Sequence, residues 1–147
     1  MKIIVGSDHA GFELKETICD HLLKQSHEVQ NVGALSLESY NYPAASDAVA
    51  QRILKKEADF GVLICGSGVG VMIRANRYFG IRAVNCCSQE MAILSREHNQ
   101  ANVICFGARL ISTENALSCL DAFLKTEQDP SPRHAERVAM LDSSTKF

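Results

Sequence analysis

Five short apolar segments alternate with segments of helical spacing, and this alternation constrains the fold more than any other feature of the chain. Most of the apolar segments lack strict alternation of apolar and polar positions, which is typical of strands buried on both faces. Strands that alternate with helices predict a parallel sheet covered on both sides. We therefore expect an α/β fold with a Rossmann-like open sheet of five parallel strands. The expected strands are residues 2–6, 27–32, 60–65, 81–86 and 102–107.

The apolar spacing predicts helices within residues 12–23, 45–53, 91–94 and 116–124. Beyond them two prolines interrupt the chain, and Ser131 and Pro132 suit the cap and first turn of a C-terminal helical arm. No linker, repeat or low-complexity tract divides the sequence. Its 147 residues, 46% of them hydrophobic, predict one domain spanning residues 1–147.

The charge and cysteine content exclude several classes of protein. A net charge of −2 gives no reason to expect nucleic acid or an anionic membrane as a partner, so we expect a small ligand. No segment resembles a signal peptide or a membrane span, and we expect a cytoplasmic protein with reduced thiols. Cys86 and Cys87 should point to opposite faces of a strand. His21, His27 and His134 lack the partner spacing of a metal site, and we expect none.

Polar residues follow three of the predicted strands. Asp8 and His9 come after the first strand, Cys65 to Gly70 after the third, and Arg109 after the fifth. Ligands of open parallel sheets bind beyond the carboxyl ends of the strands. We therefore expect these residues to gather at one edge of the sheet.

The segment CGSGVG, residues 65–70, fails the spacing of three familiar loops. A Walker loop needs a lysine directly after its last glycine, and none follows Gly68 or Gly70. A dinucleotide fingerprint that begins at Gly66 needs a glycine where Val71 stands. A cysteine phosphatase needs an arginine six residues after the nucleophile, and that position is again Val71.

The remaining interpretation is an anion-binding loop with a cysteine at its edge. Small residues let backbone amides point into one space, and a helix beginning near Val69 adds partial positive charge. The same field favours the thiolate of Cys65, which could then act as a base. The alternative is that Cys65 is a buried apolar residue and the glycines only form a tight turn.

Other polar residues also have structural alternatives. Asp8 could cap a helix and His9 lie on the surface, whereas histidine is also well suited to proton transfer near neutral pH. His98 and Asn99 could close a helix, with the asparagine in a left-handed conformation. Arg74 could be a functional cation or a surface residue. Two further arginines, Arg133 and Arg137, are one helical turn apart and suit either a solvated face or a phosphate.

Five blocks carry a family resemblance over nearly the whole chain: GSDHAGFELK, NYPAASDAVA, GVLICGSGVGVMIRANRYFGIRAV, SREHNQANVICFGAR and RHAERV. In this order and spacing, they are similar to the B-type ribose-5-phosphate isomerases within the wider ribose/galactose isomerase family. The D-H-A-G, C-G-[ST]-G-x-G and H-N elements are specific in combination.

The resemblance implies an aldose–ketose isomerase and a role for each matching residue. Cys65 matches the general base that moves a proton between C1 and C2 of the open sugar through an enediolate. Ser67 stands where many relatives have threonine and keeps the hydroxyl. Asp8 and His98 match residues that assist ring opening. The loop residues Gly66, Gly68, Val69 and Gly70 would supply backbone donors for the enediolate oxygen.

The remaining matches concern the sugar, the phosphate and a second subunit. Asn99 would hold sugar oxygens and Tyr42 would line the pocket. The resemblance implies a homodimer, or a tetramer of such dimers, with the site shared between subunits and no metal or organic cofactor. The phosphate set would be His9, Arg133 and Arg137 with Arg109 as a further cation, and residues 98–99, Arg109 and the two C-terminal arginines would come from the partner.

The expected reaction is the interconversion of D-ribose 5-phosphate and D-ribulose 5-phosphate. An isomerase of allose or galactose 6-phosphate would use the same chemistry and is the nearest alternative. A non-catalytic phosphosugar-binding domain would have little use for a thiol at the loop edge. A redox protein using Cys65, Cys86 or Cys87 is disfavoured by the missing C-x-x-C.

Overall fold

The computed structural model describes residues 1–143 and contains one sheet of five parallel strands. The order across the sheet is β2-β1-β3-β5-β4, which confirms the expected fold class. The strands are β1 (Lys2–Ser7), β2 (Glu28–Gly33), β3 (Phe60–Cys65), β4 (Ala83–Asn85) and β5 (Val103–Gly107).

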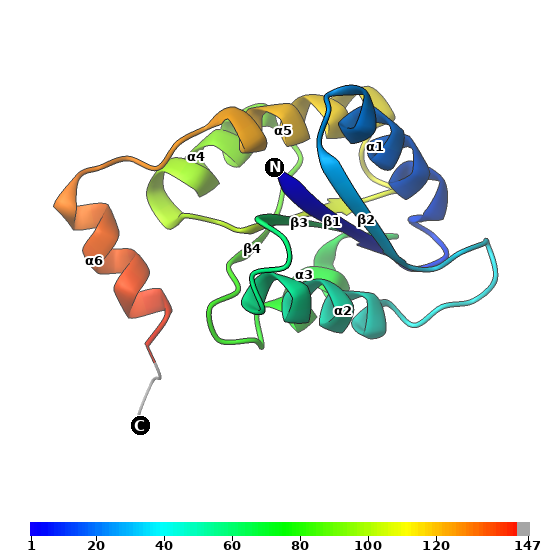
Figure 1. Cartoon of the computed structure of the whole chain (residues 1–147), viewed down its shortest axis with the longest axis horizontal. Helices are drawn as coiled ribbons and strands as arrows, with labels where there is room; N and C mark the ends of the chain where they lie inside the picture. Colours follow the sequence, from blue (N-terminus) through cyan, green and yellow to red (C-terminus); the bar gives the residue numbers. More distant parts are fainter. Residues whose placement is uncertain (144–147) are drawn as a thin grey trace.

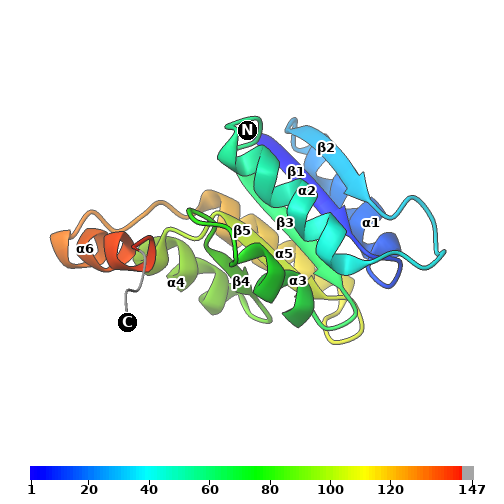
Figure 2. The ribbon, with the colours of Figure 1, turned by 90° about the horizontal axis from the view of Figure 1, so that it is seen from below.

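Helices cover both faces of the sheet. In Figure 1, α2 and α3 lie below the sheet, α1, α4 and α5 lie above it, and α6 projects beyond α4 at the left. Figure 2 shows α2 and α3 in front of the sheet and α6 again beside α4. The bounds are α1 (Phe12–Lys24), α2 (Tyr42–Leu54), α3 (Val69–Ala75), α4 (Gln89–Asn99), α5 (Thr113–Lys125) and α6 (Pro132–Leu141).

The core consists of two apolar layers, one on each face of the sheet. Ile64 and Phe106 belong to the layer under α1, α4 and α5, and both are fully buried. Leu63 and Cys65 belong to the layer under α2 and α3. Neighbouring residues of β3 thus contribute to opposite layers, which explains why this strand reads as an unbroken apolar run.

Strand β4 is shorter than the sequence pattern predicts. The backbone of Ile81 closes a turn by donating to the carbonyl of Tyr78 over 3.0 Å, so it cannot extend the strand. The expectation that Cys86 and Cys87 lie on opposite faces of a strand is wrong, because both follow the end of β4. Cys86 is nonetheless buried and Cys87 exposed.

Two helix ends also differ from the alternatives considered above. Helix α4 includes Asn99, and the left-handed residue that ends it is Gln100, with φ of 48°. Asp8 does not cap α1, because the capping position is Gly11. Instead the Oδ1 atom of Asp8 accepts a 3.0 Å hydrogen bond from the Gly11 amide, which closes a turn between β1 and α1.

The strand order places β1 next to β3 at the centre of the sheet. From β1 the chain moves outward to β2, and from β3 it moves outward on the other side. Such a reversal leaves a crevice beyond the carboxyl ends of the two central strands. Asp8 and Cys65 lie at these two strand ends.

Within residues 1–143, none of the helices has both the length and the apolar character required to cross a lipid bilayer.

Gly33, the last residue of β2, allows a prediction about stability. Gly33 has φ of +84°, and a Cβ atom there would overlap the carbonyl oxygen of Ser7. Gly80 has a similar φ of +85°, but a Cβ atom there would only approach the Leu54 side chain to 3.3 Å. Gly33→Ala should lower the free energy of unfolding by about 2–4 kcal/mol and Gly80→Ala by about 1 kcal/mol. Denaturant unfolding at matched protein concentration measures both, and equal losses would contradict the steric argument.

Candidate active site

An open cavity of about 500 Å³ lies at the carboxyl edge of the sheet. It collects residues from the ends of β1, β3 and β5 and from the start of α2. Eight of the residues expected from the sequence line it: Asp8, Tyr42, Cys65, Gly66, Ser67, Val69, Gly70 and Arg109.

Cys65 ends β3, and its thiol is held by the loop that follows. The residue is 4% exposed, and its Sγ atom accepts a hydrogen bond of 3.2 Å from the amide of Gly68. The Gly68 amide therefore fixes the position of the sulfur at the wall of the cavity, which Cys65 lines.

Each loop glycine leaves space that another residue occupies. A Cβ atom on Gly66 would lie 3.1 Å from the Arg109 guanidinium, and one on Gly70 would lie 2.7 Å from the Tyr42 ring. Gly68 has φ of +76°, and a side chain there would overlap Asn85. The glycines thus permit close packing as well as a turn.

The loop passes directly into α3, which begins at Val69 as expected. Amides of a first helical turn have no acceptor within the helix, which leaves that of Gly70 beside the cavity. The Ser67 hydroxyl accepts a bond of 3.3 Å from the Val69 amide. The loop can therefore present donors to an oxygen anion in the cavity.

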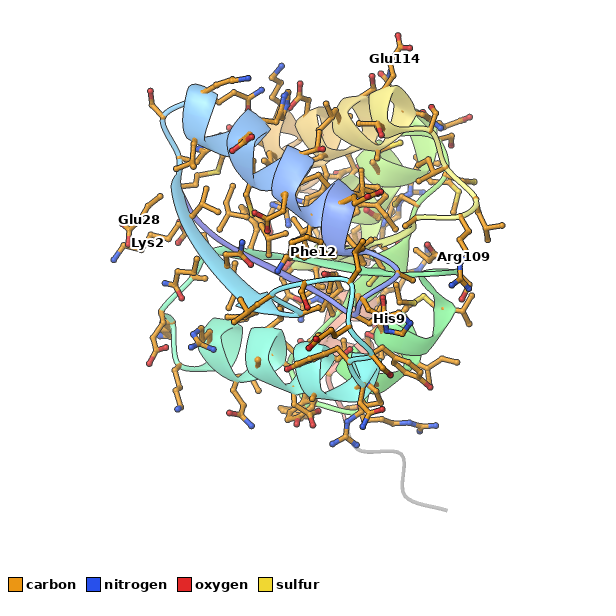
Figure 3. All side chains as sticks on the ribbon, turned by 90° about the vertical axis from the view of Figure 1, so that its right-hand side faces the viewer. Lys2, His9, Phe12, Glu28, Arg109 and Glu114 are labelled. Atoms are coloured by element: carbon orange, nitrogen blue, oxygen red, sulfur yellow. The ribbon has the colours of Figure 1, made fainter. Side chains whose placement is uncertain are left out.

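Asp8 and His9 are fixed by backbone groups. Asp8 is 7% exposed and is oriented by its bond to Gly11. The backbone amide of Tyr40 donates to Nδ1 of His9 over 3.2 Å. The same Nδ1 atom lies 3.4 Å from the carbonyl oxygen of Tyr40, so the Tyr40 backbone occupies Nδ1 in either tautomer. Figure 3 shows His9 and Arg109 at the same edge, away from Lys2 and Glu28 at the starts of β1 and β2.

Arg109 lies in a turn that is tied to the cysteine loop. Its amide donates to the carbonyl of Gly66 over 3.1 Å, and the amide of Ala108 donates to the carbonyl of Cys65 over 2.9 Å. The expectation that the partner supplies Arg109 is wrong for this chain, because the residue lines the cavity of its own subunit. It does so because it directly follows β5, a neighbour of β3.

Arg74 has a structural role. Its Nε and Nη2 atoms donate to the carboxylate of Asp47 over 2.6 and 3.1 Å, and the Tyr78 hydroxyl donates to the same carboxylate. Arg74 and Tyr78 together hold the pKa of Asp47 below its ordinary value. These contacts tie α3 to α2 next to the cysteine loop.

His98 and Asn99 lie at the opposite edge of the sheet. They end α4, which leads into the amino end of β5, whereas Cys65 ends β3 beside the carboxyl end of β5. The five residues of β5 span roughly 16 Å at about 3.3 Å per residue. Asn99 lines a separate cavity of about 410 Å³ there. One subunit therefore does not bring His98 and Cys65 together.

Arg133 and Arg137 lie on α6, which packs on α4. Both arginines are exposed, while His134 and Val138 on the other side of the helix are buried. The arm therefore presents a pair of cations at the edge where His98 lies, away from Arg109 and Cys65.

Sequence reasoning missed several residues around the site. Leu110 lines the cavity and could have been suggested by its position after Arg109. Tyr40 and Asn85 support His9 and the glycine loop, and no local pattern marks them because the fold brings them there. His134 was considered only as a metal ligand, for which it lacks partner spacing in the sequence; in the structure its ring stacks on that of His98.

Comparison with known proteins is consistent across sequence and structure. The model of the Ribose/Galactose Isomerase family matches residues 3–141. Ribose-5-phosphate isomerase B of Escherichia coli is 44% identical over 140 residues, which covers 95% of this chain and 93% of that protein. The curated relative from Mycobacterium tuberculosis with the same name is 38% identical over 142 residues, covering 96% and 88%.

Solved structures give the same result. A ribose 5-phosphate isomerase from Thermotoga maritima has a TM-score of 0.93 and 48% identity, covering 96% of this chain and 97% of that one. The type B enzyme of Trypanosoma brucei has a TM-score of 0.92 and 36% identity, covering 96% of both chains. With a family match over nearly its whole length and relatives of this similarity, the chain belongs to the ribose/galactose isomerase family.

Proposed function

We propose that this protein interconverts D-ribose 5-phosphate and D-ribulose 5-phosphate, with residues 1–147 acting as a single isomerase domain. The observation that carries the proposal is the Cys65 thiol on the cavity wall, with the Gly68 amide donating to its sulfur. The names of the relatives support the substrate. Since a phosphosugar is charged and does not diffuse through a bilayer, we place the reaction in the cytoplasm.

The reaction begins with the ring of the aldose. Its C1 hydroxyl loses a proton, the bond from C1 to the ring oxygen breaks, and the ring oxygen gains a proton. Asp8, fixed at the cavity by Gly11, and His98 of a second subunit are the groups assigned to this step. Ring opening is required because only the open sugar has the carbonyl that acidifies the neighbouring C–H bond.

Cys65 then acts as the general base. The thiolate takes the proton from C2 of the open aldose. A proton then moves from the oxygen at C2 to the oxygen at C1, the thiol gives its proton to C1, and the carbonyl is left at C2. Before that transfer, the negative charge of the enediolate lies on the oxygen at C1. Loop amides and the Ser67 hydroxyl stabilise that oxygen; one such donor can contribute about 3 kcal/mol in the transition state. The base and the donors come from one continuous segment, so their relative position is set by local structure.

The phosphate is bound by cations from two subunits. His9 presents its Nε2 side because Nδ1 is occupied by the backbone of Tyr40. Arg109 lines the same cavity, and Arg133 and Arg137 would reach it from the arm of the partner. Asn99 and Tyr42 would contact the sugar. We propose a homodimer, because the opposite positions of His98 and Cys65 in one chain require a second copy to complete the site.

The first prediction concerns the base. Cys65→Ala and Cys65→Ser should lower kcat by about 10²–10⁴-fold and change the KM for ribose 5-phosphate little, because the thiolate acts in the proton-transfer transition state. Steady-state kinetics in EDTA measures this, with Cys87→Ala as the matched control because Cys87 is exposed and outside the proposed machinery.

Turnover by Cys65→Ala at the wild-type rate would remove Cys65 as the base. If the wild type turns over only allose or galactose 6-phosphate, the proposed substrate is wrong and the proposed mechanism stands. If it binds ribose 5-phosphate but turns over none of these sugars, the protein is a binding domain and not an enzyme.

The second prediction concerns the arm. Arg137→Ala should raise the KM for ribose 5-phosphate and weaken inhibition by inorganic phosphate, each roughly tenfold, because a charge-assisted contact to the phosphate is lost. Glu136→Ala, a change on the neighbouring exposed position, should alter neither. Unchanged phosphate inhibition in Arg137→Ala would show that the arm does not bind the phosphate.

A further inference from the structure

The ring of His98 is covered by a second histidine. His134 of α6 stacks on it with ring centroids 4.3 Å apart and planes 4° from parallel. Only 4% of His134 is exposed, although Arg133 beside it in the chain is exposed. The buried side of α6 therefore places an imidazole against the proposed ring-opening residue.

Asp129 joins His134 and the start of α6 to the backbone of α4. Its amide donates a hydrogen bond of 3.0 Å to the carbonyl of Glu97, and its Oδ1 atom accepts a hydrogen bond of 2.7 Å from the amide of Ser131. Its Oδ2 atom lies 3.6 Å from Nε2 of His134. The start of α6 is thereby fastened to the last turn of α4, one residue before His98.

The electrostatics favour a neutral His134. Burial away from water lowers its pKa below the ordinary value, and His98, Arg133 and Arg137 lower the pKa further, against the opposing effect of Asp129. A neutral His134 ring places no positive charge against the stacked ring of His98. The stack is thus compatible with His98 as a proton donor.

A shared metal ion explains this cluster less well. Ligand atoms of His98, Asp129 and His134 do lie within 4.8 Å of one another. An ion bound by two imidazoles must lie near the plane of both rings, along their nitrogen lone pairs. Two rings stacked face to face at 4° from parallel cannot meet that condition.

We propose that His134 is a positioning residue for His98: the stack and the Asp129 anchor fix the direction in which the His98 ring meets the sugar of the partner subunit. The inference rests on the proposed function, in which His98 assists ring opening. It assigns His134 no contact with the substrate. Misplacement of a catalytic group by about 1 Å is enough to slow the step it serves.

Substrate choice separates ring opening from proton transfer. Ribose 5-phosphate closes a furanose ring, whereas ribulose 5-phosphate cannot, because its C5 oxygen carries the phosphate. Consumption of the ketose therefore needs the Cys65 chemistry, and the aldehyde product can leave before its ring closes. A defect confined to His98 should slow the aldose direction selectively.

The test compares His134→Ala with His134→Phe in both directions. His134→Ala should lower kcat from ribose 5-phosphate roughly tenfold, with KM and phosphate inhibition near wild type, and should change ketose consumption less than about twofold. His134→Phe, which keeps a flat ring for stacking, should restore most of the loss. Val138→Ala, which alters the other buried residue of the arm, should not slow the aldose direction selectively.

The outcomes separate the two proposals. Equal loss in both directions for His134→Ala, or no loss in either, would overturn the positioning role. No rescue by His134→Phe would also count against stacking as its basis. A wild-type protein that turns over neither sugar would instead overturn the proposed function itself.

Discussion

The parallel direction of all five strands is the constraint on which the site depends. Residues that follow strands gather at one edge, and residues that precede them gather at the other. Cys65 lies at the first edge and His98 at the second, separated by the length of β5. Under the proposed function, the base and the anion-binding loop meet the ring-opening residue only if the chain pairs with a copy of itself.

Close packing at the end of β3 then sets the chemistry of the first edge. Arg109, Asn85 and Tyr42 each occupy space that a side chain on Gly66, Gly68 or Gly70 would fill. The loop is held between these neighbours, so the Gly68 amide stays aimed at the sulfur of Cys65. The same contacts bring the Arg109 cation to the wall of the cavity.

Local patterns predicted the parts of the molecule that depend on neighbours in the chain. The bounds of β3 and the start of α3 at Val69 follow from an apolar run that meets glycines. The length of β4 was mispredicted because the Ile81 backbone closes a turn. The stacking of His134 on His98 was missed because 36 residues separate the two in sequence (134 − 98) and only the docking of α6 joins them.

The most direct test of a site completed by two chains is complementation between two variants that each fail to consume ribose 5-phosphate, with that sugar as the assay substrate. When Cys65→Ala and His98→Ala are co-expressed in equal amounts, heterodimers should make up half of all dimers. Each heterodimer has one intact site and one site that lacks both residues. About one quarter of the wild-type activity should therefore return, because half of the dimers have half of their sites intact. Heterodimers verified by mass spectrometry that show no activity beyond that of the two separate variants would contradict the account.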